Sequence, residues 1–189
     1  MNCIKTKISK GIGIISRVRS ILPLQILVLL YNTFIHPYLA YCNIIWRTAK
    51  ISSLNPLLLL QNRAVRMCTN SSYRASSGPL FIKLRVLNTF DLNNYLTAIF
   101  MHKYLNNFLP ASCNIFIQSP VVTFNYNLRN VGIFKINRYT TSYKENCISI
   151  RGPKLWNYLS NYISTSLSLS LFKKMLYELF STSYVPICL

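Results

Sequence analysis

Residues 56–70 read PLLLLQNRAVRMCTN, and this stretch decides the fold class of the chain. Its apolar residues recur at intervals of three and four, the period of one helix face: Leu57, Leu60, Ala64 and Met67. A proline fits the first turn of a helix, where its missing N–H needs no partner, so we expect this helix to begin at Pro56. Two arginines three positions apart then share a second face of the same helix.

Upstream of this helix, the sequence predicts further helices separated by prolines. Apolar residues at helical spacing predict a first helix over about 7–20, and Pro23 is placed to begin a second one that runs to about residue 35. The residue before a proline avoids helical geometry, so we expect a break at His36-Pro37. Residues 38–46 then resume as another helix.

Downstream, two turn clusters at 70–72 and 76–79 lead into a short helix from Pro79. Asp91, the only aspartate of the chain, is placed to cap the next helix, because an aspartate can accept a hydrogen bond from the first free N–H groups. That helix carries an apolar stripe from Leu92 to Phe100 and is expected to stop before Pro110.

Beyond Pro110 the pattern changes. Residues 121–124 and 132–136 suggest short extended segments, Pro153 is expected to begin a helix, and a last helix follows the serine-rich stretch 164–170. The fold class is therefore mainly α, with a helical domain over residues 1–110. A smaller mixed α+β segment that contains two terminal helices is expected over residues 111–189.

The charge balance limits the chemistry. Lys and Arg number 21 against three acidic residues, Asp91, Glu145 and Glu178, and the formal net charge is +18. Two-metal phosphoryl transfer and glycoside hydrolysis need at least two convergent carboxylates, and these three are scattered. We therefore expect no catalytic residue, and the basic excess favours a polyanionic partner.

No motif for a cofactor or a metal ion is present. The six cysteines lie far apart without a C-x-x-C pair, and neither histidine stands beside a cysteine, so we predict free cysteines, no metal site and no cofactor. His36, before a proline, is interpreted as a structural residue. His102, near a helix end, is interpreted as an exposed residue or as one that complements the helix dipole.

The basic residues occur in small groups beside tyrosines and a tryptophan. Cations that contact phosphate and rings that stack on bases together favour binding to a nucleic-acid backbone. The candidate nucleic-acid-binding residues are Arg63, Arg66, Arg74, Lys83, Arg85, Arg129, Arg151 and Lys154.

An alternative interpretation is a small basic membrane protein. Residues 21–46 contain no Lys, Arg, Asp or Glu and are long enough to span a bilayer once. Pro23 and Pro37 interrupt this stretch, and several polar side chains along it would need partners within lipid. A set of buried helices is therefore preferred, and we expect no membrane association.

The order of several segments resembles the region after the palm in non-LTR retrotransposon reverse transcriptases of the Jockey/CR1 type. The segments are LLYNTFIHPYLAYCNIIW (29–46), LLLLQNRAVRMCTNSSYRASSGPLFIKLRVLNTFDLNNY (57–95), FMHKYLNNFLP (100–110), YNLRN (126–130), IRGPKLWNYLSNYI (150–163) and SLFKKMLYELF (170–180). They occur in one order over almost the whole chain.

The resemblance implies a thumb-like helical bundle and a C-terminal tail. It places Arg63, Arg66 and Arg74 near an RNA–DNA hybrid or a duplex. The palm's metal-binding aspartates have no counterpart in these 189 residues, so we expect no polymerase activity. The resemblance also implies that the chain has no small-molecule substrate and that it is located in the nucleus or in a nucleoprotein particle. A reading frame that is rarely translated and has no cellular role is a further alternative.

Overall fold

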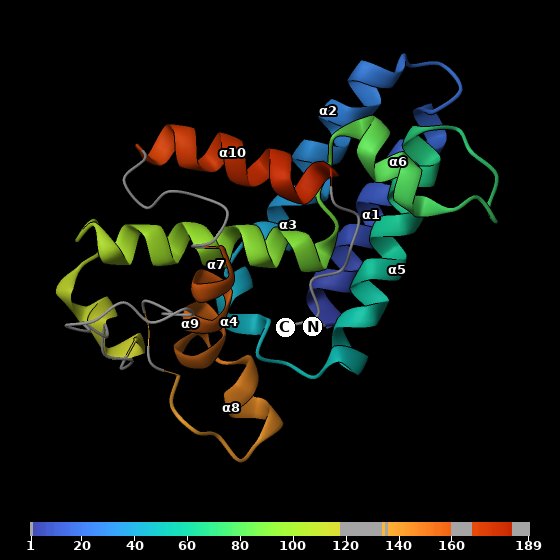
Figure 1. Cartoon of the computed structure of the whole chain (residues 1–189). Coiled ribbons are helices and arrows are strands. Elements are labelled where there is room, and N and C mark those ends of the chain that lie inside the picture. The colour runs from blue at the N-terminus through green and yellow to red at the C-terminus, as the bar shows by residue number, and fades with distance from the viewer. Residues whose placement is uncertain (1, 118–133, 135, 160–167, 183–189) are drawn as a thin grey trace. The chain divides into compact units, whose positions relative to one another are not determined.

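The computed structural model describes residues 2–117, 134, 136–159 and 168–182, and the chain is mainly helical, as predicted (Figure 1). The helices are α1 (Asn2–Val18), α2 (Leu24–Phe34), α3 (His36–Ala40), α4 (Asn43–Trp46), α5 (Ile51–Cys68), α6 (Ser77–Leu84), α7 (Thr89–Leu105), α8 (Ser142–Asn146), α9 (Ile148–Leu159) and α10 (Leu169–Thr182), with a short 3₁₀ helix, η1 (Ala111–Phe116). The expected extended segments at 121–124 and 132–136 lie outside the described residues, apart from Phe134 and Ile136.

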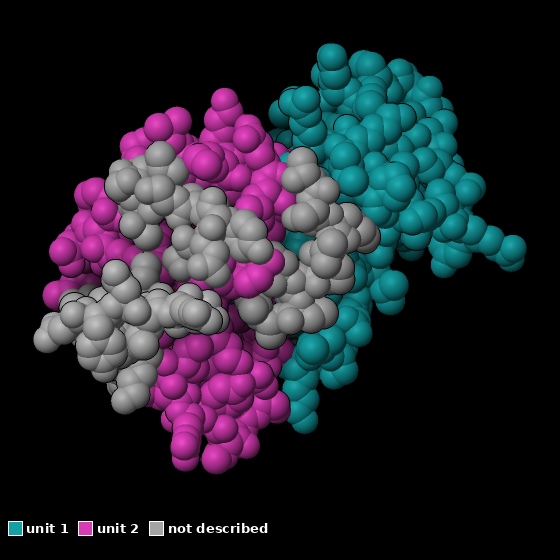
Figure 2. All heavy atoms as spheres, in the orientation of Figure 1, with its two compact units in different colours: residues 1–43, 50–92, 181–186 teal, residues 44–49, 93–180, 187–189 magenta. Residues whose placement is uncertain are grey.

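The chain forms two compact units (Figure 2). Unit 1 contains residues 1–43, 50–92 and 181–186, and unit 2 contains residues 44–49, 93–180 and 187–189. Helix α7 therefore begins in unit 1 and continues into unit 2. The expected domains, 1–110 and 111–189, divide the chain at a different place and stay a prediction.

Unit 1 is built around α1 and α5, which lie side by side (Figure 1). Helix α1 buries Ile8, Ile12 and Ile15 on one face, at the spacing that the sequence predicts, and begins about one turn earlier than expected. Gly11 allows a close approach, since a Cβ atom there would lie 3.1 Å from the Phe34 carbonyl oxygen. The buried apolar face of α5 differs from the expected stripe: Leu57 and Ala64 are buried as expected, Leu60 and Met67 are only half-buried, and Leu54, Val65 and Cys68 are buried as well.

A buried amide joins three segments of unit 1. Gln61, on α5, is fully buried, and its Nε2 donates to the Tyr31 hydroxyl and to the Leu87 carbonyl oxygen, each at 2.8 Å. Its Oε1 accepts from the Thr89 hydroxyl, also at 2.8 Å. Because both hydrogens of the amide group and its oxygen are used, Gln61 satisfies polar groups that would otherwise be buried without partners.

Unit 2 has a ring cluster at its core. Phe172 of α10 stacks on the His102 ring of α7 at 4.4 Å between centroids and lies 5.7 Å from the Trp156 ring of α9. All three side chains are buried. The prediction of an exposed His102 was therefore wrong: the imidazole stacks on the Phe172 ring in the interior.

The stretch 21–46, which contains no Lys, Arg, Asp or Glu, is divided among three helices. Helix α2 has 11 residues, α3 has five and α4 has four, and Pro37 lies in the first turn of α3. Helix α3 ends at its C-cap, Tyr41, whose backbone is extended, and Cys42 then adopts a left-handed conformation before α4. No helix in the described part of the chain has the length and apolar character needed to cross a membrane.

Two helix starts differ from the prediction. Pro56 lies inside α5, which begins at Ile51, and Pro153 lies inside α9, which begins at Ile148. In both helices the proline is the sixth residue, so its missing N–H removes one backbone hydrogen bond near the start of the helix. Prediction of a helix start from a proline therefore identifies the right region of the chain, but it places the start too late by the residues of the helix that precede the proline.

The cap of α7 also differs from the prediction. The Asn88 side-chain oxygen accepts from the backbone N–H groups of Phe90 and Asp91, at 2.8 and 2.9 Å. Asn88 is therefore the cap, and Asp91 lies in the first turn, where its Oδ2 accepts from Asn88 Nδ2 at 2.5 Å. The Asn88 side chain therefore accepts from the Asp91 backbone N–H and donates to the Asp91 carboxylate, whereas in a capping box the acidic side chain accepts from the backbone N–H of the cap residue.

Burial raises the pKa of Asp91 to about 6, against the hydrogen bond from Asn88, which lowers it. Because the folded state holds this proton more tightly than the unfolded state, the stabilisation is complete below pH 3.8 and is lost as the pH rises through about 6. We expect Asp91→Asn to be more stable than the parent at pH 7 by up to about 3 kcal/mol, with no difference near pH 3. Urea unfolding at several pH values measures this, and a difference independent of pH would contradict it.

Candidate nucleic-acid interface

Helix α5 carries two of the predicted arginines. Arg63 and Arg66 are three residues apart, with Arg63 exposed and Arg66 half-buried. The same helix buries Ala64 and Val65 between them in the core. Core packing therefore fixes the direction in which the two guanidinium groups extend.

A pocket bordered by arginines lies at the C-terminal end of α5. It has a volume of about 430 Å³ and is lined by Arg19, Arg63, Arg66, Met67 and residues 70–73. Arg19 follows the last turn of α1, so the pocket joins residues from two helices and a loop. We call it the larger arginine pocket.

A second pocket lies along the same pair of helices. It has a volume of about 240 Å³ and is lined by α1 residues that include Gly13, Ser16 and Arg17, together with Leu60 and Arg63 of α5. We call it the smaller arginine pocket. Arg63 lines both pockets, so four arginines border these two hollows on unit 1: Arg17, Arg19, Arg63 and Arg66.

Two of these arginines are held by the surrounding structure. Arg66 Nε donates to the Ala75 carbonyl oxygen at 2.8 Å, and Arg19 Nη1 donates to the Met67 sulfur at 3.0 Å. Each bond occupies one N–H of a guanidinium group that carries five. The remaining N–H groups are donors of the kind that phosphate oxygens accept.

The loop after α5 has a fixed backbone. Asn70 is in the left-handed conformation, with φ of 51°, and the N–H groups of Asn70 and Ser71 donate to the carbonyl oxygens of Met67 and Arg66. These bonds satisfy the last carbonyl groups of α5, as in a Schellman motif. The loop brings Tyr73, whose side chain is 82% exposed, to the edge of the larger arginine pocket.

The electrostatic environment of the two pockets is uniformly positive. As far as the described residues go, no acidic side chain lines either pocket. Four guanidinium groups without a neighbouring carboxylate repel one another and attract an anion. The arrangement suits a ligand with several negative charges in sequence.

Three further candidates from the sequence lie elsewhere on unit 1. Arg74 is exposed in the loop that follows Tyr73 and does not line the larger pocket. Lys83 is exposed on α6, and Arg85, directly after α6, is exposed with a left-handed φ of 51°. Arg129 lies outside the described residues.

Arg151 is buried in unit 2 and is only 6% exposed. Its Nη2 donates to Asn94 Oδ1 at 2.6 Å. Burial, and then the positive charge of Arg47, lower the pKa of Arg151 to about 10. Its guanidinium therefore faces the interior of unit 2, and we leave it out of the candidate interface.

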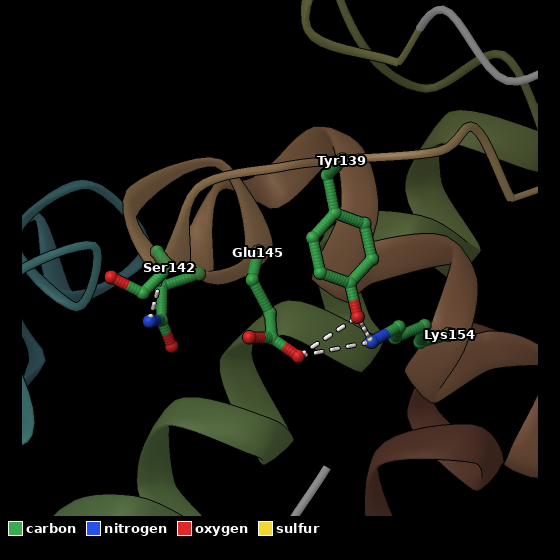
Figure 3. A network of polar contacts seen from close by, with 5 residues as sticks. Tyr139, Ser142, Glu145 and Lys154 are labelled. Carbon is green, nitrogen blue, oxygen red and sulfur yellow. Dashed lines mark hydrogen bonds and ion pairs between the residues drawn. The ribbon is translucent and has the colours of Figure 1, made fainter.

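Lys154 belongs to a local polar network (Figure 3). Its Nζ donates to the Tyr139 hydroxyl at 2.5 Å and forms an ion pair with Glu145 at 3.3 Å, and the Tyr139 hydroxyl donates to Glu145 at 2.9 Å. Burial lowers the pKa of Lys154, but the bonds to Tyr139 and Glu145 outweigh it and the net pKa is raised. The network ties the segment before α8 to α9.

The structure therefore brings together two of the eight predicted residues, Arg63 and Arg66, and adds two that the prediction missed. Arg17 lies in α1 and Arg19 directly follows it, and the basic character of this N-terminal segment was the only signal for them. Their place beside α5 depends on how α1 packs, which the sequence pattern does not specify. The described residues contain no group of three or more His, Cys, Asp or Glu that could hold a metal ion. The cysteines at 3, 42, 68, 113 and 147 are free thiols.

Comparison with family models, with curated proteins and with solved structures found no match for this chain.

Proposed function

We propose that this chain is a catalytically incomplete part of a retrotransposon reverse transcriptase that binds nucleic acid without sequence preference. The single observation that carries the binding proposal is the pair of hollows that share Arg63 and are bordered by four arginines without an acidic neighbour. Phosphate contacts by arginine supply affinity that does not depend on base sequence.

The proposed partner is the backbone of an RNA–DNA hybrid or a duplex, and the proposed architecture is a thumb-like helical bundle with a mixed α+β tail. Both proposals rest on the segment order 29–46, 57–95 and 100–110 described above, and the helical bundle of unit 1 is compatible with them. The lack of the palm's aspartates from these 189 residues is the reason for proposing binding without polymerisation.

The Arg63→Gln/Arg66→Gln double variant tests the binding proposal. If both side chains contact phosphate, the plot of log affinity against log salt becomes shallower by roughly two, because each contact contributes about 0.9 to the slope. Fluorescence anisotropy with labelled hybrid and duplex of several sequences measures this slope.

A control is Arg138→Gln, which removes one arginine charge from an exposed residue of unit 2. It is expected to leave the slope nearly unchanged. Affinity that does not depend on salt, or no binding by the parent chain, would contradict the proposal.

A further inference from the structure

We propose that the two arginine pockets receive one single strand of nucleic acid, with a base of that strand stacked on Tyr73. This inference rests on the proposed nucleic-acid binding and specifies the form of the ligand at the site. A single-stranded segment could be an overhang beside a hybrid or a free strand, and both present the same chemistry to the pockets.

The size of the hollows favours a single strand. The larger pocket, about 430 Å³, lies in the range of small-ligand pockets and can hold one nucleotide unit. The smaller one, about 240 Å³, extends along the same two helices. A paired duplex keeps its bases inside and can offer only its outer phosphates, whereas an unpaired nucleotide can enter a concave site.

The position of Tyr73 supports the same conclusion. Its ring is 82% exposed beside three arginines, and the loop that carries it is held by the bonds of Asn70 and Ser71 to the end of α5. An exposed ring next to a basic hollow gives the two contacts that non-specific single-strand binding uses, a stacking surface and cations for the backbone.

The arginines border the path that such a strand would follow. Arg17 lines the smaller pocket, Arg19 and Arg66 line the larger one, and Arg63 lines both. A strand that enters both pockets therefore has a guanidinium group beside it in each of them. Arg63 is the residue that the two pockets share, so it lies between the two proposed positions of the strand.

Gly13 offers a way to block the smaller pocket without changing any charge. It is exposed on α1, and a Cβ atom placed there meets no other heavy atom within 4 Å. Gly13→Leu places an apolar side chain at the pocket wall, and leucine is a better helix former than glycine. The variant is therefore expected to fold.

The experiment compares binding of an oligo(dT) strand of about ten nucleotides, within the site size of single-strand binders, with binding of a blunt duplex of equal phosphate number. The full chain and the variants Tyr73→Ala and Gly13→Leu are measured at several salt concentrations, with Tyr143→Ala as the control. Tyr143 is 66% exposed and lies in unit 2. Circular dichroism verifies that each variant keeps the helical content of the parent.

We expect the parent chain to bind the strand more tightly than the duplex. Tyr73→Ala should weaken strand binding roughly tenfold, the effect of one lost stacking contact, without changing the salt slope. Gly13→Leu should also weaken strand binding, and Tyr143→Ala should have no effect.

Two results would overturn the inference. If the duplex binds as tightly as the strand, or if Tyr73→Ala and Gly13→Leu leave strand binding unchanged, the single-strand assignment is wrong while backbone binding stands. If neither nucleic acid binds to the parent chain, the proposed function fails as well.

Discussion

Replacing Gln61 with alanine is expected to lower the free energy of unfolding by roughly 3 kcal/mol, because it leaves buried polar groups unpaired and creates a cavity. The groups concerned are the Tyr31 hydroxyl, the Leu87 carbonyl and the Thr89 hydroxyl, which all bond to this one amide at 2.8 Å. A loss of this size is a large fraction of the stability of an ordinary domain.

Gln25→Ala is the matched control, because Gln25 is an exposed glutamine on α2 of the same unit. Its effect should stay within about 0.5 kcal/mol, as for most surface substitutions. Urea unfolding followed by far-ultraviolet circular dichroism is suitable, since it reports the helices of unit 1, which contains no tryptophan. Equal effects of the two substitutions would show that the amide network contributes little.

Phe172→Ala is expected to destabilise unit 2 by about 3–5 kcal/mol, the usual cost of removing a buried phenylalanine. Phe172 is 1% exposed and contacts both the His102 ring and the Trp156 ring. Loss of the ring removes apolar burial and two aromatic contacts together. Both tryptophans of the chain, Trp46 and Trp156, belong to unit 2, so tryptophan fluorescence during urea unfolding measures the effect there.

Phe108→Ala provides the comparison for this substitution. Phe108 belongs to the same unit and is 66% exposed, so its removal creates no cavity. We expect a change in unfolding free energy below about 1 kcal/mol. A similarly small effect at Phe172 would mean that the ring cluster is not a stabilising core.

Most helices could be predicted from the apolar period and the prolines. The faces of α1 and α10 agree well with the pattern: Ile8, Ile12 and Ile15 are buried on α1, and Phe172 and Leu176 are buried on α10. These faces are set by local periodicity, which the sequence shows directly.

The differences arose where two residues compete for one role. Asn88 and Asp91 can both cap a helix, and in the structure Asn88 takes the cap, while Thr89, next in the chain, donates its hydroxyl to the buried Gln61. The sequence gives no signal for that tertiary bond. His102 likewise has a polar side chain whose burial depends on the rings of α9 and α10.

The candidate site could be predicted only in part for the same reason. Arg63 and Arg66 share a helix face, so their proximity is visible in the spacing. Arg17 and Arg19 lie more than 40 positions earlier and reach the site only through the packing of α1 against α5. Arg151 carries the same charge but is buried, and charge alone does not distinguish these cases.

The division into two units gives bound ligands a thermodynamic signature. Both arginine pockets belong to unit 1, whereas both tryptophans belong to unit 2. A ligand stabilises only what it binds, by about 2.7 kcal/mol at a free concentration one hundred times its dissociation constant. If the units unfold separately, an oligonucleotide will raise the melting temperature seen by circular dichroism and leave the tryptophan transition in place. The tryptophan transition of unit 2 therefore serves as an internal reference for measuring ligand binding to the pockets of unit 1 without a label.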